Sequence, residues 1–285
     1  MPATPPNPPR RGDVARVLVV VATVLAGVGL LGSCTGERPT LAAASAAPST
    51  STTVVATSAP AATDPTTPTT EQSAPASLGP DSLLGYIATP TGRPVVHAEA
   101  SDGSASIDVP ATTSAGAPTT FAVIGDPTGE TTGWYRVLLP TRPNGATGWV
   151  PASSVAITKT PFRVFVALGA RELRVERDGT EVLRAPVAVG TSENPTPVGA
   201  SYVTELIDNQ EPQGAYGPYA FGLALHSDTL TEFAGGPGQV GIHGTNQPGL
   251  IGQAVSHGCV RLRNADIEAL VGVGLPLGAP VFVTG

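Results

Sequence analysis

The sequence predicts a mainly β fold with one or two short helices, built by the residues from 80 onward. Runs rich in Val, Ile, Leu and aromatic residues recur there, separated by Gly, Pro, Asn and Asp, which is the spacing of short strands and turns. In FRVFVAL, residues 162–168, apolar side chains alternate with others, as the two faces of a strand require. Asp178–Gly179 joins two further runs and is a strong hairpin signal. We therefore expect two β-rich domains, over residues 80–158 and 161–285.

The N-terminus ahead of these domains has the pattern of a bacterial export signal. A start that contains three arginines precedes an uncharged stretch, residues 17–33, which is at the lower length limit for a membrane-spanning helix. The sequence LLGSC resembles a lipobox, in which the signal is cut before the cysteine, here Cys34, and the thiol is lipidated. We assign residues 1–34 to this segment, with an uncleaved membrane helix as the alternative. Both interpretations place the rest of the chain outside the cytoplasmic membrane.

Residues 35–79 form a linker made mostly of Ala, Thr, Ser and Pro, without an aromatic residue. Such a segment has too few large apolar groups to offset the entropy of ordering, so we expect it to be disordered. Random-coil scaling gives it an average span of roughly 35–40 Å, which suits a tether between a membrane anchor and a folded unit. With Cys34 held at the membrane, Cys259 remains as an unpaired thiol, which is unusual in an exported protein.

Charge and motifs exclude several classes of function. The formal net charge is −7 and no basic cluster occurs beyond the N-terminal arginines, so nucleic acid is not an expected partner. The sequence contains neither a Gly-rich phosphate loop nor a dinucleotide-binding fingerprint, and we expect no cofactor.

The first domain, residues 80–158, ends in two strand-like segments, GWYRVLLP and GATGWVPASSV. These segments resemble the last strands of bacterial SH3-like domains, so we expect a small SH3-like barrel. Trp134 and Trp149 lie in these segments. In one interpretation they line a ligand groove, and in the other they fill the small core.

The second domain, residues 161–285, carries the single strong helix signal. Asn264 is the expected N-cap, Asp266 and Glu268 suit the positive first turn, and IEALVGV supplies the apolar spacing. The remaining apolar runs of this domain have the length and composition of strands.

The reactive candidates of the second domain are Cys259, in SHGCVRL, and His243, in GIHGTN. A thiol with an ordinary pKa near 8.5 is a poor nucleophile, and a neighbouring imidazole can hold its proton as a thiolate–imidazolium pair. Gly258 permits backbone conformations that direct successive N–H groups at a developing oxyanion. His257 faces the same way as Cys259 in an extended chain, so these two residues and His243 are also three potential zinc ligands. A structural zinc site requires a fourth ligand, and we expect no metal; the other alternative is an inert, buried cysteine.

The string IHGTN…QAVSHGCVRLRNADIEAL resembles the L,D-transpeptidase catalytic domain of the YkuD type, over about residues 161–284. The resemblance implies a β-sandwich fold, Cys259 as the nucleophile and His243 as the general base. It also implies that the carbonyl of Gly244 orients the imidazole and that backbone N–H groups around residues 257–259 form the oxyanion hole. Arg261 replaces the Asn that some members of the family have.

The resemblance further implies the reaction and its partners. Cys259 attacks the amide between a diamino acid and the terminal D-alanine of a peptidoglycan tetrapeptide, and an amine of a neighbouring stem then takes over the acyl group. Carbapenems are the expected inhibitors, and the site faces the periplasm or cell wall from a lipid-anchored chain. The alternatives are an L,D-carboxypeptidase, in which water is the acceptor, and a non-catalytic peptidoglycan-binding lipoprotein.

Several further residues are candidates for contact with the substrate. We expect Ser256, Arg261 and Tyr219 to take this role. Tyr216 and Phe221 are additional aromatic candidates for the cleft, although aromatic residues at such positions also pack in cores. His226 lies in a β run without a place in the motif, and we expect it to be structural.

Overall fold

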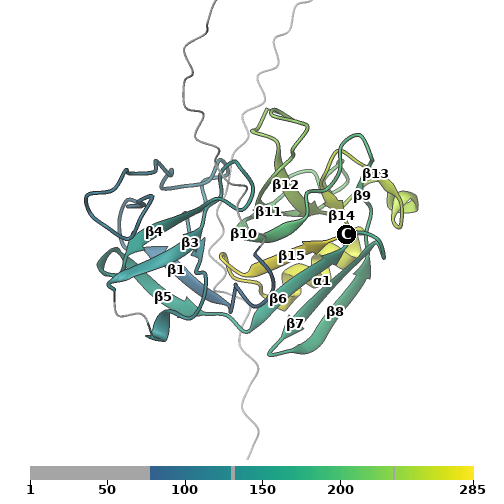
Figure 1. Cartoon of the computed structure of the whole chain (residues 1–285). Coiled ribbons are helices and arrows are strands. Elements are labelled where there is room, and N and C mark those ends of the chain that lie inside the picture. Colours follow the sequence, from purple (N-terminus) through teal and green to yellow (C-terminus); the bar gives the residue numbers. More distant parts are fainter. Residues whose placement is uncertain (1–77, 130–131, 234) are drawn as a thin grey trace, which may run out of the picture. The chain divides into compact units, whose positions relative to one another are not determined.

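The structure is a computed structural model that describes residues 78–129, 132–233 and 235–285 (Figure 1). The predicted export segment, the lipidation site at Cys34 and nearly all of the predicted linker lie outside these residues. Within the described ranges, no helix has both the length and the apolar character needed to span a membrane.

The first described part, residues 78–160, is built from short strands. Strand β1 pairs with β2 on one side and β5 on the other, both antiparallel, and β3 pairs with β4 as a separate hairpin. The strands are β1 (Tyr86–Pro90), β2 (Phe121–Ala122), β3 (Trp134–Leu138), β4 (Thr147–Pro151) and β5 (Val155–Lys159), with short 3₁₀ helices η1 (Pro127–Gly129) and η2 (Ala152–Ser154). We call this part the N-terminal β unit.

The core of the N-terminal β unit is aliphatic and contains Phe121. Trp134 and Trp149 are both half-buried and are not members of this core cluster. The ring of Trp134 instead meets the ring of His97 edge-on, with 5.2 Å between the ring centroids. The small core is therefore filled without the two tryptophans, contrary to the second of the two interpretations.

The second part is organised around one eight-stranded sheet with the strand order β14-β12-β11-β10-β15-β6-β7-β8 (Figure 1). Its strands are β6 (Phe162–Ala167), β7 (Glu172–Arg177), β8 (Thr180–Pro186), β10 (Gly199–Asp208), β11 (Tyr219–His226), β12 (Gln239–His243), β14 (Val260–Arg261) and β15 (Pro280–Thr284). Two further strands, β9 (Val189–Gly190) and β13 (Ala254–Ser256), form a parallel pair, and η3 (Pro248–Leu250) precedes β13. The mainly β fold class is confirmed.

The predicted hairpin at Asp178–Gly179 is confirmed, because these two residues connect β7 to β8. Their φ angles are 50° and 75°, and a two-residue hairpin turn of the common type needs positive φ at both central positions. The alternation in β6 is also confirmed. Phe162, Val164 and Val166 are buried in the large apolar cluster of the second part, which we call the main core, while the residues between them are only partly buried.

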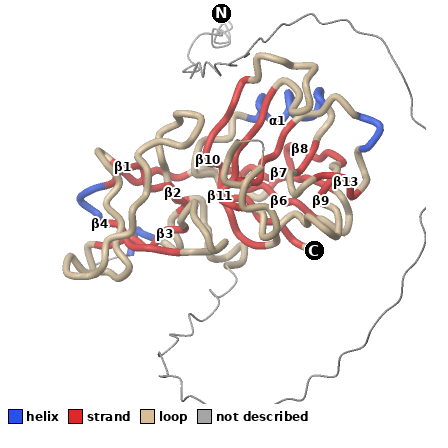
Figure 2. Tube along the Cα trace, turned by 90° about the horizontal axis from the view of Figure 1, so that it is seen from above, coloured by secondary structure: helices blue, strands red, loops and turns tan. Residues whose placement is uncertain are grey.

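The described residues contain one α-helix, α1 (Asn264–Val273), which is drawn in blue in Figure 2. The helix packs Ile267 and Leu270 into the main core. The prediction that Asn264 caps this helix is wrong. Arg263 occupies the N-cap position without a side-chain hydrogen bond, and the Asn264 side chain is used elsewhere. The helix ends at Gly274, whose φ of 80° is the left-handed conformation that a helix C-terminus commonly adopts.

A third apolar cluster joins the two parts. Leu83, Ala122 and Leu138 of the N-terminal β unit pack with residues of the large sheet, among them Tyr202 and Phe282. Because these side chains are almost fully buried, the N-terminal β unit covers one face of the large sheet at this cluster.

Candidate active site

Cys259 lies directly before β14, which runs parallel to β12 with Ile242 opposite Val260. Val260 and Ile242 point into the main core. Because side chains alternate between the faces of a strand, Cys259 and His243 lie together on the other face. The pairing of β12 with β14 therefore brings the two segments side by side.

The sulfur of Cys259 is half-buried and accepts a hydrogen bond from the backbone N–H of Gly241, with 3.4 Å between N and Sγ. Burial raises the pKa of the thiol, and the Gly241 N–H and the nearby Arg261 guanidinium oppose that rise. The free thiol is therefore protonated at neutral pH.

His243 is buried at the end of β12, and its Nδ1 lies 2.6 Å from the carbonyl oxygen of Gly244. A carbonyl accepts hydrogen bonds only, so Nδ1 carries the proton and Nε2 is the basic nitrogen. The predicted orienting contact of Gly244 is thus present. Burial lowers the pKa of His243 to about 4, against the effect of the Gly244 carbonyl, and Arg261 lowers it further.

The expected thiolate–imidazolium pair does not fit the raised pKa of Cys259 and the lowered pKa of His243. Burial disfavours the charged form of both groups, which leaves a neutral thiol beside a neutral imidazole in the free protein. In addition, the hydrogen-bond partner of Sγ within the described structure is the Gly241 N–H and not the imidazole. In the free protein the thiol proton is therefore on the sulfur and not on His243.

The residues before Cys259 form a tight turn closed by Ser256. The Ser256 hydroxyl donates to the carbonyl of Cys259, at 2.6 Å, and accepts from the N–H of Gly258, at 3.1 Å. Gly258 has a φ of 117°, which favours glycine. Ser256 is buried and has this turn-forming role in place of the predicted substrate contact. Because the N–H of Gly258 donates to the Ser256 hydroxyl, the N–H groups of His257 and Cys259 are the two that remain of the predicted oxyanion donors.

His257 is exposed, and its ring lies against that of Phe233, with 5.1 Å between the ring centroids and 30° between the planes. The zinc interpretation would require the side chains of His257, His243 and Cys259 to converge. Over the described parts of the chain, no three His, Cys, Asp or Glu side chains are grouped closely enough to hold a metal ion.

The three aromatic candidates for the cleft have different positions. Phe221 is buried in the main core, and Tyr219 packs against the same core. Tyr216 instead lies beside the imidazole of His243, with 4.8 Å between the two ring centroids. Since it is 40% exposed, a ligand can reach it. From the sequence we expect Tyr219 rather than Tyr216 to contact the substrate, since the sequence does not show which of two nearby rings is exposed.

Asn264 is a site residue that the sequence assigned to another role. Its Oδ1 accepts a hydrogen bond from the N–H of Thr245, at 2.8 Å, and its Nδ2 donates to the carbonyl of Pro212, at 3.3 Å. A Cβ on Gly244 would lie 2.6 Å from Oδ1, and one on Gly217 would also clash with it. Asn264 therefore links the segment after His243 to the loop that carries Tyr216.

Arg261 lies opposite His243 on β14 and is half-buried. Its Nε is buried without a hydrogen-bond partner among the described residues, and no carboxylate within them forms an ion pair with its guanidinium. The described residues therefore supply no carboxylate to Arg261. A buried donor without a partner is costly, so this guanidinium is available to an anionic ligand.

The fold and the site together define a mainly β protein with a cysteine and a histidine facing the same side of two parallel strands. The model of the L,D-transpeptidase catalytic domain (YkuD) matches residues 161–283. The YkuD protein of Bacillus subtilis strain 168 is 30% identical over 152 residues, which is 51% of this chain and 84% of that protein. The YkuD protein of Bacillus licheniformis is 35% identical over 124 residues, 44% of this chain and 66% of that protein.

Among solved structures, L,D-transpeptidase 3 from Mycobacterium tuberculosis is similar at 16% identity, with a TM-score of 0.38 over 59% of this chain and 92% of that chain. The match to the Bacillus subtilis protein covers most of that relative. The chain belongs to the YkuD family of L,D-transpeptidases.

Proposed function

We propose that this protein is a peptidoglycan L,D-transpeptidase that works through a cysteine acyl-enzyme. The observation that carries the proposal is the placement of Cys259 and His243 on one face of two parallel strands, with the imidazole oriented through Nδ1 by Gly244. This arrangement leaves Nε2 free to act as a base for the thiol.

In the first half-reaction, the thiol of Cys259 attacks the carbonyl between the L-centre of a diamino acid and the terminal D-alanine of a tetrapeptide stem. The thiol proton passes to Nε2 of His243, and a C–S bond forms. The N–H groups of His257 and Cys259 stabilise the negative charge on the oxygen. The imidazolium then protonates the nitrogen of D-alanine, the C–N bond breaks, and a thioester remains.

In the second half-reaction, an amine from a neighbouring stem attacks the thioester. His243 accepts a proton from the amine, and the thiolate of Cys259 leaves and is reprotonated by the imidazolium. The products are a cross-linked pair of stems and the free enzyme. With water as the acceptor, the same steps give a tripeptide stem, which is the carboxypeptidase alternative.

Arg261 is the residue proposed to bind the donor stem. Its guanidinium adjoins the catalytic pair and has no carboxylate partner among the described residues, so a carboxylate of the stem peptide fits it. The exposed ring of Tyr216 is proposed as a second wall beside His243. Tyr219 is half-buried against the core and remains a predicted substrate contact.

The location and the accessory parts are also proposals. Lipidation of Cys34 would anchor the chain to the membrane, and the linker over residues 35–79 would carry the catalytic part toward the cell wall. The short-stranded N-terminal β unit supports an SH3-like domain over residues 80–158, since it has two small sheets around one aliphatic core.

Incubation of the full-length protein with a disaccharide-tetrapeptide, followed by mass spectrometry, tests the proposed reaction. We expect free D-alanine and a cross-linked dimer, and we expect Cys259→Ala to form neither. Release of D-alanine with only a tripeptide product would establish the carboxypeptidase instead. No reaction with any stem would support the non-catalytic alternative.

A carbapenem provides an independent test of the nucleophile. The thiol opens the β-lactam ring, the C–N bond breaks, and the nitrogen takes the proton, so the adduct has the mass of the whole drug. We expect this adduct on the peptide that contains Cys259. A turnover-competent Cys259→Ala variant would show that the assigned nucleophile is wrong.

A further inference from the structure

The turn Arg142–Asn144 of the N-terminal β unit forms hydrogen bonds to the connection between β11 and β12. The Arg142 guanidinium donates from Nη1 to the carbonyl of Pro237, at 2.8 Å, and from Nη2 to the carbonyls of Ser227, at 2.9 Å, and Leu230, at 3.1 Å. These acceptors lie near both ends of the connection. One charged side chain thus fixes its start and its end together.

Asn144 adds a second set of bonds at the start of the same connection. Its Nδ2 donates to the carbonyl of His226, at 2.8 Å, and to Oδ1 of Asp228, at 3.0 Å. Its Oδ1 accepts from the N–H of His226, at 2.9 Å. An amide side chain is suited to this position because it both donates and accepts.

A glycine in this connection, Gly238, leaves room for the Arg142 guanidinium. Gly238 has a φ of 69°, and a Cβ there would lie 3.1 Å from Nη2 of Arg142 and would collide with the carbonyl of Leu230. Only glycine allows the two to approach so closely. The contact is therefore built into both sides, by Arg142 on one and by Gly238 on the other.

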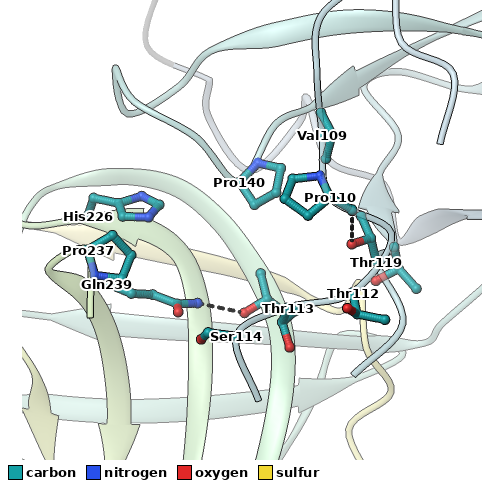
Figure 3. A pocket seen from close by; sticks show the side chains of 12 residues that line it. Val109, Pro110, Thr112, Thr113, Ser114, Thr119, Pro140, His226, Pro237 and Gln239 are labelled. Atoms are coloured by element: carbon teal, nitrogen blue, oxygen red, sulfur yellow. Dashed lines mark hydrogen bonds between the residues drawn. The ribbon is translucent and has the colours of Figure 1, made fainter. Parts of the chain in front are cut away.

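A cavity borders the base of the connection. It has a volume of about 370 Å³, with His226, Pro237 and Gln239 on one side and Pro110 and Pro140 of the N-terminal β unit on the other (Figure 3). The hydrogen bonds of Arg142 and Asn144 cross from the N-terminal β unit to the connection beside this cavity.

The same connection reaches the active site at Phe233. The backbone of Phe233 pairs with that of Gly236 through two hydrogen bonds, of 3.0 and 2.9 Å, and the Phe233 ring lies against His257. His257 immediately precedes Gly258 and Cys259. The turn that presents the nucleophile is therefore held from inside by the Ser256 hydroxyl and from outside by the Phe233 ring.

We infer that Arg142 and Asn144 are positioning residues of the reaction: by fixing the β11–β12 connection, they hold Phe233 against His257 and so keep the oxyanion donors of the Ser256–Cys259 turn in place. This inference rests on the proposed function. It gives the N-terminal β unit an indirect part in catalysis, in addition to any ligand that this unit binds.

Two reactions of Cys259 in the full-length protein separate positioning from folding. Alkylation by iodoacetamide needs the thiolate alone, whereas acylation by a carbapenem also needs the oxyanion donors. In Arg142→Ala and Asn144→Ala we expect acylation to slow on the order of tenfold while alkylation stays nearly unchanged. Arg136→Ala is the matched control, because Arg136 lies in the same unit and its side chain, among the described residues, bonds only to the hydroxyl of the half-buried Thr147.

A double-mutant cycle tests the path through Phe233. If Arg142 acts through that ring, Phe233→Ala slows acylation to a similar extent, and Arg142→Ala combined with Phe233→Ala is no slower than the slower single variant. Losses that multiply would overturn the inference, because they would show that the two residues act independently.

Milder variants keep the test decisive should the alanine variants unfold. Arg142→Lys retains the charge but not the fork that reaches three carbonyls, and Phe233→Leu retains apolar bulk. We expect intermediate acylation rates at temperatures far below the melting midpoint of each variant. Folded variants that are acylated at the wild-type rate would refute positioning. A wild-type protein that no carbapenem acylates and that turns over no stem would instead refute the proposed function, and the two failures are distinct.

Discussion

The pH dependence of Cys259 alkylation tests whether the catalytic pair is neutral in the free protein. Burial raises the pKa of the thiol and lowers that of His243 to about 4. The change is the pH of the iodoacetamide reaction, from 5 to 9.5. With both groups neutral, the thiolate forms only as the pH approaches the raised pKa of the thiol, and the rate follows the thiolate.

The two protonation models differ in magnitude and in the shape of the profile. A thiol whose pKa is above its ordinary value of about 8.5 is less than about 3% thiolate at pH 7. The alkylation rate should then rise about tenfold for each pH unit between 6 and 8. A thiolate–imidazolium pair would instead give a constant, high rate over this range, because the thiolate persists between the two pKa values.

Mass spectrometry of the peptide that contains Cys259 measures the rate in the full-length protein, separately from any reaction at Cys34. His243→Ala is the control, since in the neutral model the imidazole contributes little to the ionisation of the resting thiol. We expect its profile to keep the steep rise. A plateau from pH 5 to 8 in the wild-type protein that disappears in His243→Ala would refute the neutral pair.

Three further variants test single contacts of the site. Because the pKa of His243 falls from its ordinary 6.5 to about 4 on folding, the unfolded chain binds more protons than the folded chain between these pH values. Acidification from pH 6.5 to 4 should therefore lower the free energy of unfolding by about 3 kcal/mol through this group. Denaturant titration of His243→Gln should show a pH dependence that lacks this contribution. Gly258→Ala, at a φ of 117°, should cost about 1–2 kcal/mol in urea unfolding and slow carbapenem acylation, and a wild-type acylation rate would contradict the turn geometry. Asn264→Ala should lower turnover and cost about 1–2 kcal/mol without loss of helical circular dichroism, whereas a loss of helix with normal turnover would restore the capping role.

The features that the sequence predicted well depend on local rules. The hairpin at Asp178–Gly179 follows from the φ angles that two residues can adopt, and the burial of alternate residues in β6 follows from strand geometry. The nearness of His243 and Cys259 came from the motif that they share with a family, since spacing alone cannot bring two segments together. Strand pairing between β12 and β14 supplies the reason.

The features that the sequence did not predict depend on groups that meet only in the folded chain. Asn264 is a residue type that commonly caps helices, but its side chain forms hydrogen bonds to the backbone of Thr245 and Pro212 instead. Ser256 has a hydroxyl that fits a substrate contact, but the tight turn at Gly258 engages it first. The protonation of the pair depends on burial, which no motif encodes.

A neutral resting thiol fits the proposed export of the chain, in which Cys259 would have no disulfide partner. Oxidants attack the thiolate far faster than the thiol, so burial that raises the pKa of Cys259 slows its oxidation. The same burial lowers the reactivity of the thiol, so the proposed acyl transfer requires a base. His243 is the proposed base, because its Nδ1 is fixed on Gly244 and its low pKa keeps Nε2 unprotonated in the free protein. In this proposal, protection from oxidation and the need for a base are two consequences of one buried thiol.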